Sequence, residues 1–392
     1  MVMKNKFNEQ CITYSQMNLI FNVRIFFRKF TTWIRAYIIS SYVGIGTAEE
    51  LFGRLYLEST DFGDILHVIF GNEISNRFAL LLNQFTFGLR DLITAQLAGN
   101  SEAVNENVNN LYKNTEDIAA FLASISPYFN EAEWKNMLGT YLQYTLEEAN
   151  LYVSGDYGKD IEIFDRLMTL TNQMGYIFAQ ALFDYLTSGS QNTNNIPPQG
   201  SQQCMTLELV NEIYNIRMIW FDLATWVRSF MLSKYRGIGN VNEVHARLNQ
   251  VPAEFINTLK QFFGENPAFD TYLLQLNAYI DLIDSLTTAQ MKGNTDEIKR
   301  ITQLLYQNAD ERAALVSSLN PSYWNKNELQ TRLYDNLRST LDESTSFLTG
   351  DYARNLDIFS TLLDQAESIS GFIAQGLVNY INSQSFLVRN NP

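Results

Sequence analysis

The chain has 392 residues, a formal net charge of −14 and 46% hydrophobic residues, which include 26 Phe and 21 Tyr. This composition excludes an intrinsically disordered chain, and the length suits two domains, because single hydrophobic cores stop growing at about 250–300 residues. The acidic excess argues against non-specific binding to nucleic acid or to an anionic membrane, both of which need clustered Lys and Arg.

The N-terminal segment is short and polar. Polar residues follow two early lysines within 1–17, so we expect an N-terminal extension rather than a secretory signal peptide. The most apolar stretch, 25–43, carries three basic residues, and we therefore expect no transmembrane segment. The two cysteines, Cys11 and Cys204, are too few for a disulfide framework. Such usage is typical of a reducing cytoplasm, where we expect the protein to reside.

Much of the sequence occurs twice, at an offset that grows from 193 to 195 residues. The matching pairs are 31–46 with 224–239, 94–104 with 288–298, 111–127 with 305–321, and 153–164 with 348–359. So long a match with only two single-residue insertions indicates an internal duplication. The expected domains are an N-terminal extension at 1–17, a first helical bundle at 18–187, a polar linker at 188–207, a second bundle at 208–382 and a C-terminal tail at 383–392.

Each copy has the apolar spacing of helices. In 160–185, apolar residues recur at spacings of three and four, which places them on one helical face. Gly99 followed by Asn100, and Gly155 followed by Asp156, are typical of a helix end followed by a new N-cap. The first copy is expected to contain a long helix at about 18–43, short helices at 47–57 and 61–69, and four helices near 72–98, 100–125, 130–153 and 156–187. Short junctions require antiparallel neighbours, so the predicted fold class is all-α, with two tandem antiparallel helical bundles.

Motifs for metal, nucleotide or nucleophilic chemistry are missing from the sequence. The two histidines, His67 and His245, do not align between the copies, and neither stands in the Glu-x-x-His pattern of a di-iron bundle. The sequence contains no G-x-S-x-G and no P-loop, and the pair Gly44 and Gly46 lacks the third glycine of a dinucleotide fingerprint. We therefore expect no metal site, no cofactor and, on balance, no enzymatic activity.

Several polar and aromatic residues do recur in both copies, and they form the candidate binding set. Its members are Trp33, Arg35, Asn114, Asp117 and Glu148 in the first copy, and Trp226, Arg228, Asn308, Glu311 and Glu343 in the second. A Trp and an Arg two residues apart point roughly 200° apart on a helix, so one can be core while the other lies at an edge. Two interpretations remain open: Arg35 pairs with a carboxylate on a neighbouring helix, or it joins Asn114 and the acids in a polar pocket.

The motifs W-x-R at 33–35, FGNEIxxRF at 70–78 and GDYxxDIxIFD at 155–165 resemble a family of uncharacterised helical proteins. That family comes from Gram-positive, often spore-forming bacteria, and some members carry an automatic acetylglutamate kinase label. The label conflicts with this sequence, because amino-acid kinases are α/β folds with glycine-rich phosphate loops.

Family members usually carry one histidine three residues before the first tryptophan and another in the helix that corresponds to 130–153 here. The residues at these positions here are Phe30 and Tyr141 in the first copy, and Leu223 and Asn336 in the second. The resemblance therefore favours the fold and weakens any metal or acid–base role.

Our leading hypothesis is a non-enzymatic binding or structural protein of the bacterial cytoplasm, with a link to sporulation implied by the resemblance. Its partner would be a protein or a small molecule that the sequence does not identify. The alternative is a small-molecule binder or enzyme that uses the Trp, Arg, Asn and acid set inside each bundle. The two differ in whether Arg35, Asn114, Asp117 and Glu148 converge in one pocket.

Overall fold

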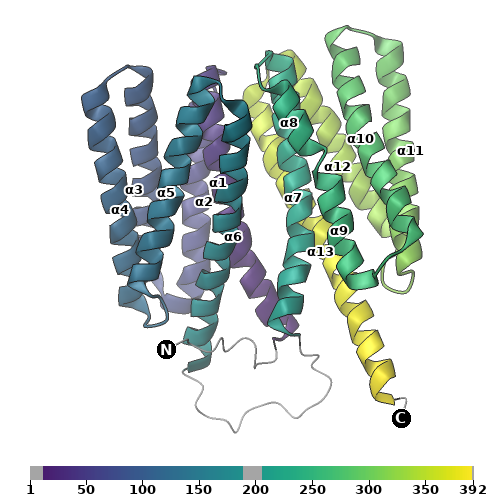
Figure 1. The fold of residues 1–392 in the computed structure, drawn as a ribbon, viewed down its shortest axis with the longest axis horizontal. Coiled ribbons are helices and arrows are strands. Elements are labelled where there is room, and N and C mark those ends of the chain that lie inside the picture. Colours follow the sequence, from purple (N-terminus) through teal and green to yellow (C-terminus); the bar gives the residue numbers. More distant parts are fainter. Residues whose placement is uncertain (1–11, 189–204, 391–392) are drawn as a thin grey trace. The chain divides into compact units, whose positions relative to one another are not determined.

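The computed structural model describes residues 12–188 and 205–390, and within these ranges the chain is all-α, as predicted (Figure 1). No strand occurs in the described ranges; a single isolated bridge joins Ile12 to Met205. The chain divides into two compact units, unit 1 at Met1–Thr206 and unit 2 at Leu207–Pro392. This division falls at the end of the linker expected from the sequence. Residues 189–204 of that linker lie outside the described residues.

Unit 1 is a ring of antiparallel helices. Its helices are α1 (Tyr14–Val43), α2 (Ala48–Phe70), α3 (Asn72–Leu97), α4 (Ser101–Ile125), α5 (Glu131–Ser154) and α6 (Tyr157–Ser188). Each helix packs against the next in the chain, and α6 packs back against α1 (Figure 1). This closure brings side chains from α1, α5 and α6 to one place.

Unit 2 has the same order of neighbours. Its helices are α7 (Leu207–Arg236), α8 (Val241–Leu248), α9 (Val251–Phe263), α10 (Pro267–Met291), α11 (Thr295–Leu319), α12 (Lys326–Thr349) and α13 (Tyr352–Asn390). Helix α13 packs back against α7, as α6 does against α1. These helix contacts are consistent with the two bundles predicted from the repeat.

The predicted helix boundaries carry the expected caps. The side chain of Asn100 accepts a hydrogen bond from the backbone N–H of Ala103 at the start of α4, and Asn294 caps α11 in the same way. Gly155 and Gly350 end α5 and α12 in the left-handed conformation, with φ of 77° and 71°. Glycine reaches this conformation at little cost, so the repeated glycines fix two equivalent helix ends.

One part of the helix prediction was wrong for unit 1. Residues 47–57 and 61–69 were expected to form two short helices, but α2 runs unbroken from Ala48 to Phe70. In unit 2 the equivalent segment is broken between α8 and α9, next to Pro252. Proline has no N–H to give to the carbonyl four residues back, and the residue at its position in unit 1, by the repeat, is Ser59. The break therefore occurs in unit 2 and not in unit 1.

The ends of the bundles also differ from the prediction. Helix α1 starts at Tyr14 inside the expected extension, because Thr13 and Gln16 form a reciprocal capping box. Helix α13 continues to Asn390, so the described part of the expected tail at 383–392 is helical.

Aromatic side chains dominate the core of each unit. Trp33 and Trp134 in unit 1, and Trp226 and Trp324 in unit 2, are almost fully buried.

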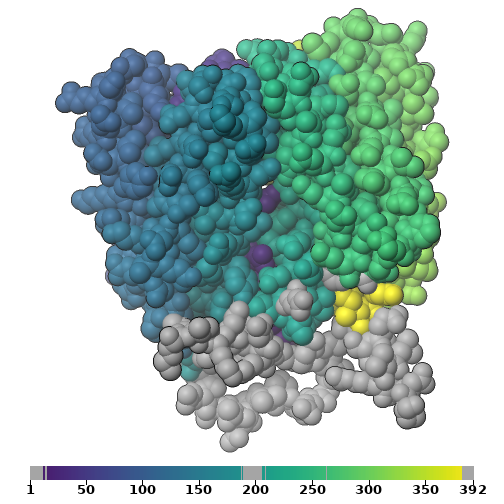
Figure 2. Space-filling model, viewed as in Figure 1, coloured from purple at the N-terminus to yellow at the C-terminus, as the bar shows by residue number. Residues whose placement is uncertain are grey.

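The side chains of α4, α5 and α6 form a continuous surface over the centre of unit 1 on the face that Figure 2 shows. In the described part of the chain, no helix has the length and apolar character needed to cross a membrane.

Candidate functional site

Arg35 of α1 lies at the centre of unit 1, between two carboxylates from other helices. Its Nη1 donates to Glu148 Oε1 of α5 at 2.5 Å, and its Nη2 donates to Asp160 Oδ2 of α6 at 2.8 Å. Its Nη1 also donates to Asp160 Oδ1 at 3.2 Å, so the pairing with Asp160 is bidentate. All three side chains are at most 4% exposed, and the guanidinium carbon lies 4.4 Å from the centroid of the Phe164 ring. This cluster ties three helices together through charge-assisted hydrogen bonds.

The charges of this cluster do not balance, because one arginine faces two carboxyl groups. Burial lowers the pKa of Arg35, but the charges of Asp160 and Glu148 outweigh it and hold the pKa above its ordinary value. Burial raises the pKa of Glu148 to about 7, with Arg35 opposing the rise and Asp160 adding to it. Burial and the neighbouring Asp160 therefore both favour the protonated form of Glu148, and Arg35 favours the ionised form.

Unit 2 has a related cluster with one fewer charge. Arg228 Nη1 lies 3.4 Å from Glu343 Oε1 and hydrogen-bonds to Asn355 Oδ1. The guanidinium also lies 4.7 Å from the centroid of the Phe359 ring, which matches the place of Phe164 in the repeat. Burial lowers the pKa of Arg228, because Glu343 only partly offsets the loss of solvent. Burial likewise raises the pKa of Glu343 to about 7.

Sequence reasoning missed Asp160 and Asn355, which occupy equivalent places in the two clusters. These two residues do not recur as one residue type, because an aspartate in unit 1 corresponds to an asparagine in unit 2. A usable signal was present, since both residues lie in the repeated segment GDYGKD and GDYARN, in the first turn of the last helix.

The other predicted polar residues lie elsewhere, so the predicted set does not converge in one pocket. Asn114 donates to the backbone carbonyl of Leu81 at 3.1 Å, and Asn308 donates to that of Gln275 at 2.8 Å. Asn114 therefore joins α4 to α3, and Asn308 joins α11 to α10. Asp117 and Glu311 are exposed on the surface.

The two repeated tryptophans are core residues, and each contacts one charged side chain. Trp33 Nε1 donates to Glu58 Oε1 of α2 at 3.1 Å. Trp226 lies under the guanidinium of Arg247 from α8, 5.3 Å from the ring centroid. In each unit, therefore, the tryptophan of the first helix contacts a charged residue of the next helix, α2 in unit 1 and α8 in unit 2.

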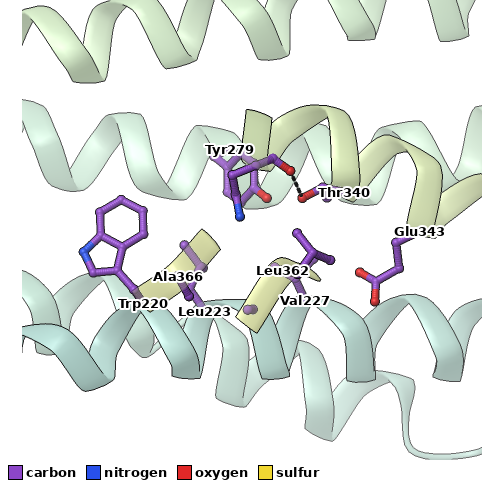
Figure 3. A pocket seen from close by; sticks show the side chains of 10 residues that line it. Trp220, Leu223, Val227, Tyr279, Thr340, Glu343, Leu362 and Ala366 are labelled. Carbon is purple, nitrogen blue, oxygen red and sulfur yellow. Dashed lines mark hydrogen bonds between the residues drawn. The ribbon is translucent and has the colours of Figure 1, made fainter. Parts of the chain in front are cut away.

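A second buried polar group lies near the Arg35 cluster in unit 1. Thr31 Oγ1 lies 3.0 Å from the Tyr141 hydroxyl and 3.1 Å from Thr171 Oγ1. By the repeat, the equivalent positions in unit 2 are Ala224, Asn336 and Ala366. All three line a small cavity of about 10 Å³ beside Glu343 (Figure 3). Tyr141 and Asn336 also occupy one of the positions where the resembling family carries histidine.

Neither possible metal ligands nor comparisons with known proteins identify a function for this site. Among the described residues there is no group of three or more His, Cys, Asp or Glu side chains placed to hold a metal ion. Comparisons with protein-family models, with curated proteins and with solved structures found no match.

Proposed function

We propose that this chain is a non-enzymatic binding or structural protein of the bacterial cytoplasm, built by tandem duplication of one helical bundle. The matched segments, the equivalent glycine caps and the shared order of helix neighbours support the duplication. The acidic net charge of −14 favours a partner other than nucleic acid.

The observation that carries this proposal is the enclosure of Arg35. An arginine that binds a ligand or stabilises a transition state must direct its donors toward space that the ligand can enter. Both terminal nitrogens of Arg35 are instead committed to Glu148 and Asp160, in surroundings that leave all three side chains buried. We infer that the cluster orders α1, α5 and α6, and that the partner is recognised on the outer surface.

The biological setting is proposed from the sequence resemblance. The motifs shared with helical proteins of Gram-positive, often spore-forming bacteria favour a role linked to sporulation. The low cysteine content supports a reducing cytoplasm.

A second candidate function, small-molecule binding, is favoured by a surface hollow in unit 1. This hollow has a volume of about 690 Å³ and lies where the ends of α3, α4 and α5 meet. Tyr42, Gln96 and Asn150 line it and are joined by hydrogen bonds, and none of its lining residues is charged. Its size falls within the range of ligand pockets, and its chemistry suits a neutral polar molecule.

Native mass spectrometry of the full chain, purified from its own host, tests the proposal. We expect the mass of the chain alone or of a complex with another protein. A stoichiometric small-molecule adduct that is lost in Gln96→Ala would favour the second candidate instead. Conversion of such an adduct into a product by the purified chain would contradict a non-enzymatic role.

A further inference from the structure

The centres of the two units are filled differently. In unit 1, the phenol of Tyr141 reaches the hydroxyl of Thr31, which also contacts the hydroxyl of Thr171. All three side chains are buried, and they come from α5, α1 and α6. The space between these helices is therefore occupied by hydrogen-bonded side-chain atoms.

The equivalent residues of unit 2 are smaller. Ala224 and Ala366 stand where unit 1 has threonines, and Asn336 stands in place of the tyrosine. A cavity of about 10 Å³ remains, and these three residues line it. Such a volume is about that of one water-sized sphere, the minimum that a buried water requires.

Polar groups line this cavity as well as apolar ones. In Figure 3, Trp220 and Glu343 lie at opposite ends of the lining, with Leu223, Val227 and Leu362 between them. Glu343 is fully buried, and its Oε2 has no hydrogen-bond partner among the described residues, although Oε1 contacts Arg228. A buried carboxylate oxygen without a partner is costly, so a donor at this place would stabilise the fold.

The half-buried Asn336, the buried Thr340 and Tyr279 also supply polar groups to the lining, and so does the ring N–H of Trp220, which has no hydrogen-bond partner among the described residues. The Thr340 hydroxyl donates to the backbone carbonyl of Asn336 at 2.9 Å and also hydrogen-bonds to the Tyr279 side chain. Because buried waters usually make two to four hydrogen bonds, a cavity lined by a carboxylate, an amide and a hydroxyl favours water over an apolar occupant.

We propose that the centre of unit 2 binds one structural water molecule, which donates to Glu343 and takes the place that the Tyr141 hydroxyl fills in unit 1. The centre of unit 1 is then filled by side chains, and the centre of unit 2 is hydrated. The ligand is a single water, and the site is specific to the second copy.

The test counts long-lived internal waters in the full chain by oxygen-17 magnetic relaxation dispersion. The triple variant Ala224→Thr, Asn336→Tyr, Ala366→Thr replaces three cavity residues of unit 2 by the equivalent residues of unit 1. We expect this variant to have one long-lived water fewer than the wild type. The reciprocal variant in unit 1, Thr31→Ala, Tyr141→Asn, Thr171→Ala, should gain one. An unchanged count in the refilled unit 2 variant would overturn the proposal.

A crystal structure of the wild-type chain covers the case in which either triple variant fails to fold. We expect solvent density within hydrogen-bonding distance of Glu343 Oε2, and its loss in the milder variant Ala366→Thr. A cavity closed by side-chain movement, or one without solvent density in the wild type, would contradict the proposal.

Discussion

Asp160 and Asn355 occupy the same place in the two units and differ by one charge. Asp160 accepts two hydrogen bonds from Arg35, whereas Asn355 accepts from Arg228 through its amide oxygen. Both side chains are fully buried. The cluster of unit 1 therefore contains two carboxyl groups and one arginine, and the cluster of unit 2 contains one carboxyl group and one arginine.

Replacement of Asp160 by Asn should lower the pKa of Glu148. The charge of Asp160 contributes to raising this pKa to about 7, and its removal leaves Arg35 to favour the ionised form. Carbon-13 NMR titration of the Glu148 carboxyl group measures the shift. The matched control is Glu343, whose pKa should not move in this variant; equal shifts at both sites would point to a global change instead.

The reverse change, Asn355→Asp, should destabilise unit 2. The Asn355 amide donates to Ser346 Oγ at 2.9 Å, and a carboxylate cannot make that donation. Loss of a buried hydrogen bond of this kind costs about 1–3 kcal/mol. Urea denaturation of the variant gives the value, and Asp351→Asn serves as an exposed control on the same helix junction. A variant as stable as the wild type would show that the amide donation is dispensable.

Stability should fall as pH rises through the window from about 4.5 to about 7. Glu148 and Glu343 have folded-state pKa values near 7, against an ordinary value of 4.5, because burial disfavours their charged forms. In this window the folded chain holds more protons than the unfolded chain, so raising the pH favours unfolding. Each group contributes up to roughly 3 kcal/mol, since one pKa unit corresponds to about 1.4 kcal/mol.

Denaturant melts at several pH values measure this slope. Glu148→Gln should remove the part that belongs to unit 1 and leave that of unit 2. A stability that rises steadily with pH across the window would show that arginine pairing dominates over burial at both glutamates.

Gly376→Ala should destabilise unit 2 through contact with Trp324. A β-carbon at Gly376 would lie 2.0 Å from Trp324 Nε1, closer than atoms can approach. By the repeat, Ala181 of unit 1 corresponds to Gly376, and Phe129 corresponds to Trp324. The larger Trp is thus paired with Gly in unit 2, and the smaller Phe is paired with Ala in unit 1. Overpacking of this kind costs about 1–3 kcal/mol.

Thermal melts of three variants separate this contact from helix propensity. Gly139→Ala has no atom within 4 Å of the added carbon and should be neutral or stabilising by about 0.5–1 kcal/mol. Trp324→Phe combined with Gly376→Ala reproduces the unit 1 pair and should recover part of the loss. If the double variant is no better than Gly376→Ala, the two residues do not compensate each other.

The sequence predicted the helices well where local chemistry decides them. The caps at Asn100 and Gly155, and the apolar spacing of 160–185, are local signals, and α4, α5 and α6 begin and end close to the expected residues. The break expected within α2 was wrong because no proline stands there, whereas Pro252 lies beside the break in unit 2.

The site was predicted only in part, because burial and long-range pairing are not visible in a helical pattern. Recurrence selected Arg35 and Glu148, which do meet, but also Asn114, which binds a backbone carbonyl, and Asp117, which is exposed. Recurrence of residue type did not select Asp160, because the equivalent residue of unit 2 is Asn355, although both lie in the repeated GDY segment. The central question is therefore what Arg35 contributes.

Denaturant unfolding of Arg35→Ala, with and without a small-molecule extract of the host, tests the structural role most directly. We predict a loss of about 3–5 kcal/mol, because the substitution leaves Glu148 and Asp160 buried without their partner. Arg338→Ala, which removes an exposed ion pair with Asp335, should cost at most about 1 kcal/mol. The extract should shift the wild type and the Arg35 variant equally, or not at all. A small loss of stability, together with an extract-induced stabilisation that disappears in Arg35→Ala, would contradict the structural role and place a ligand at this arginine.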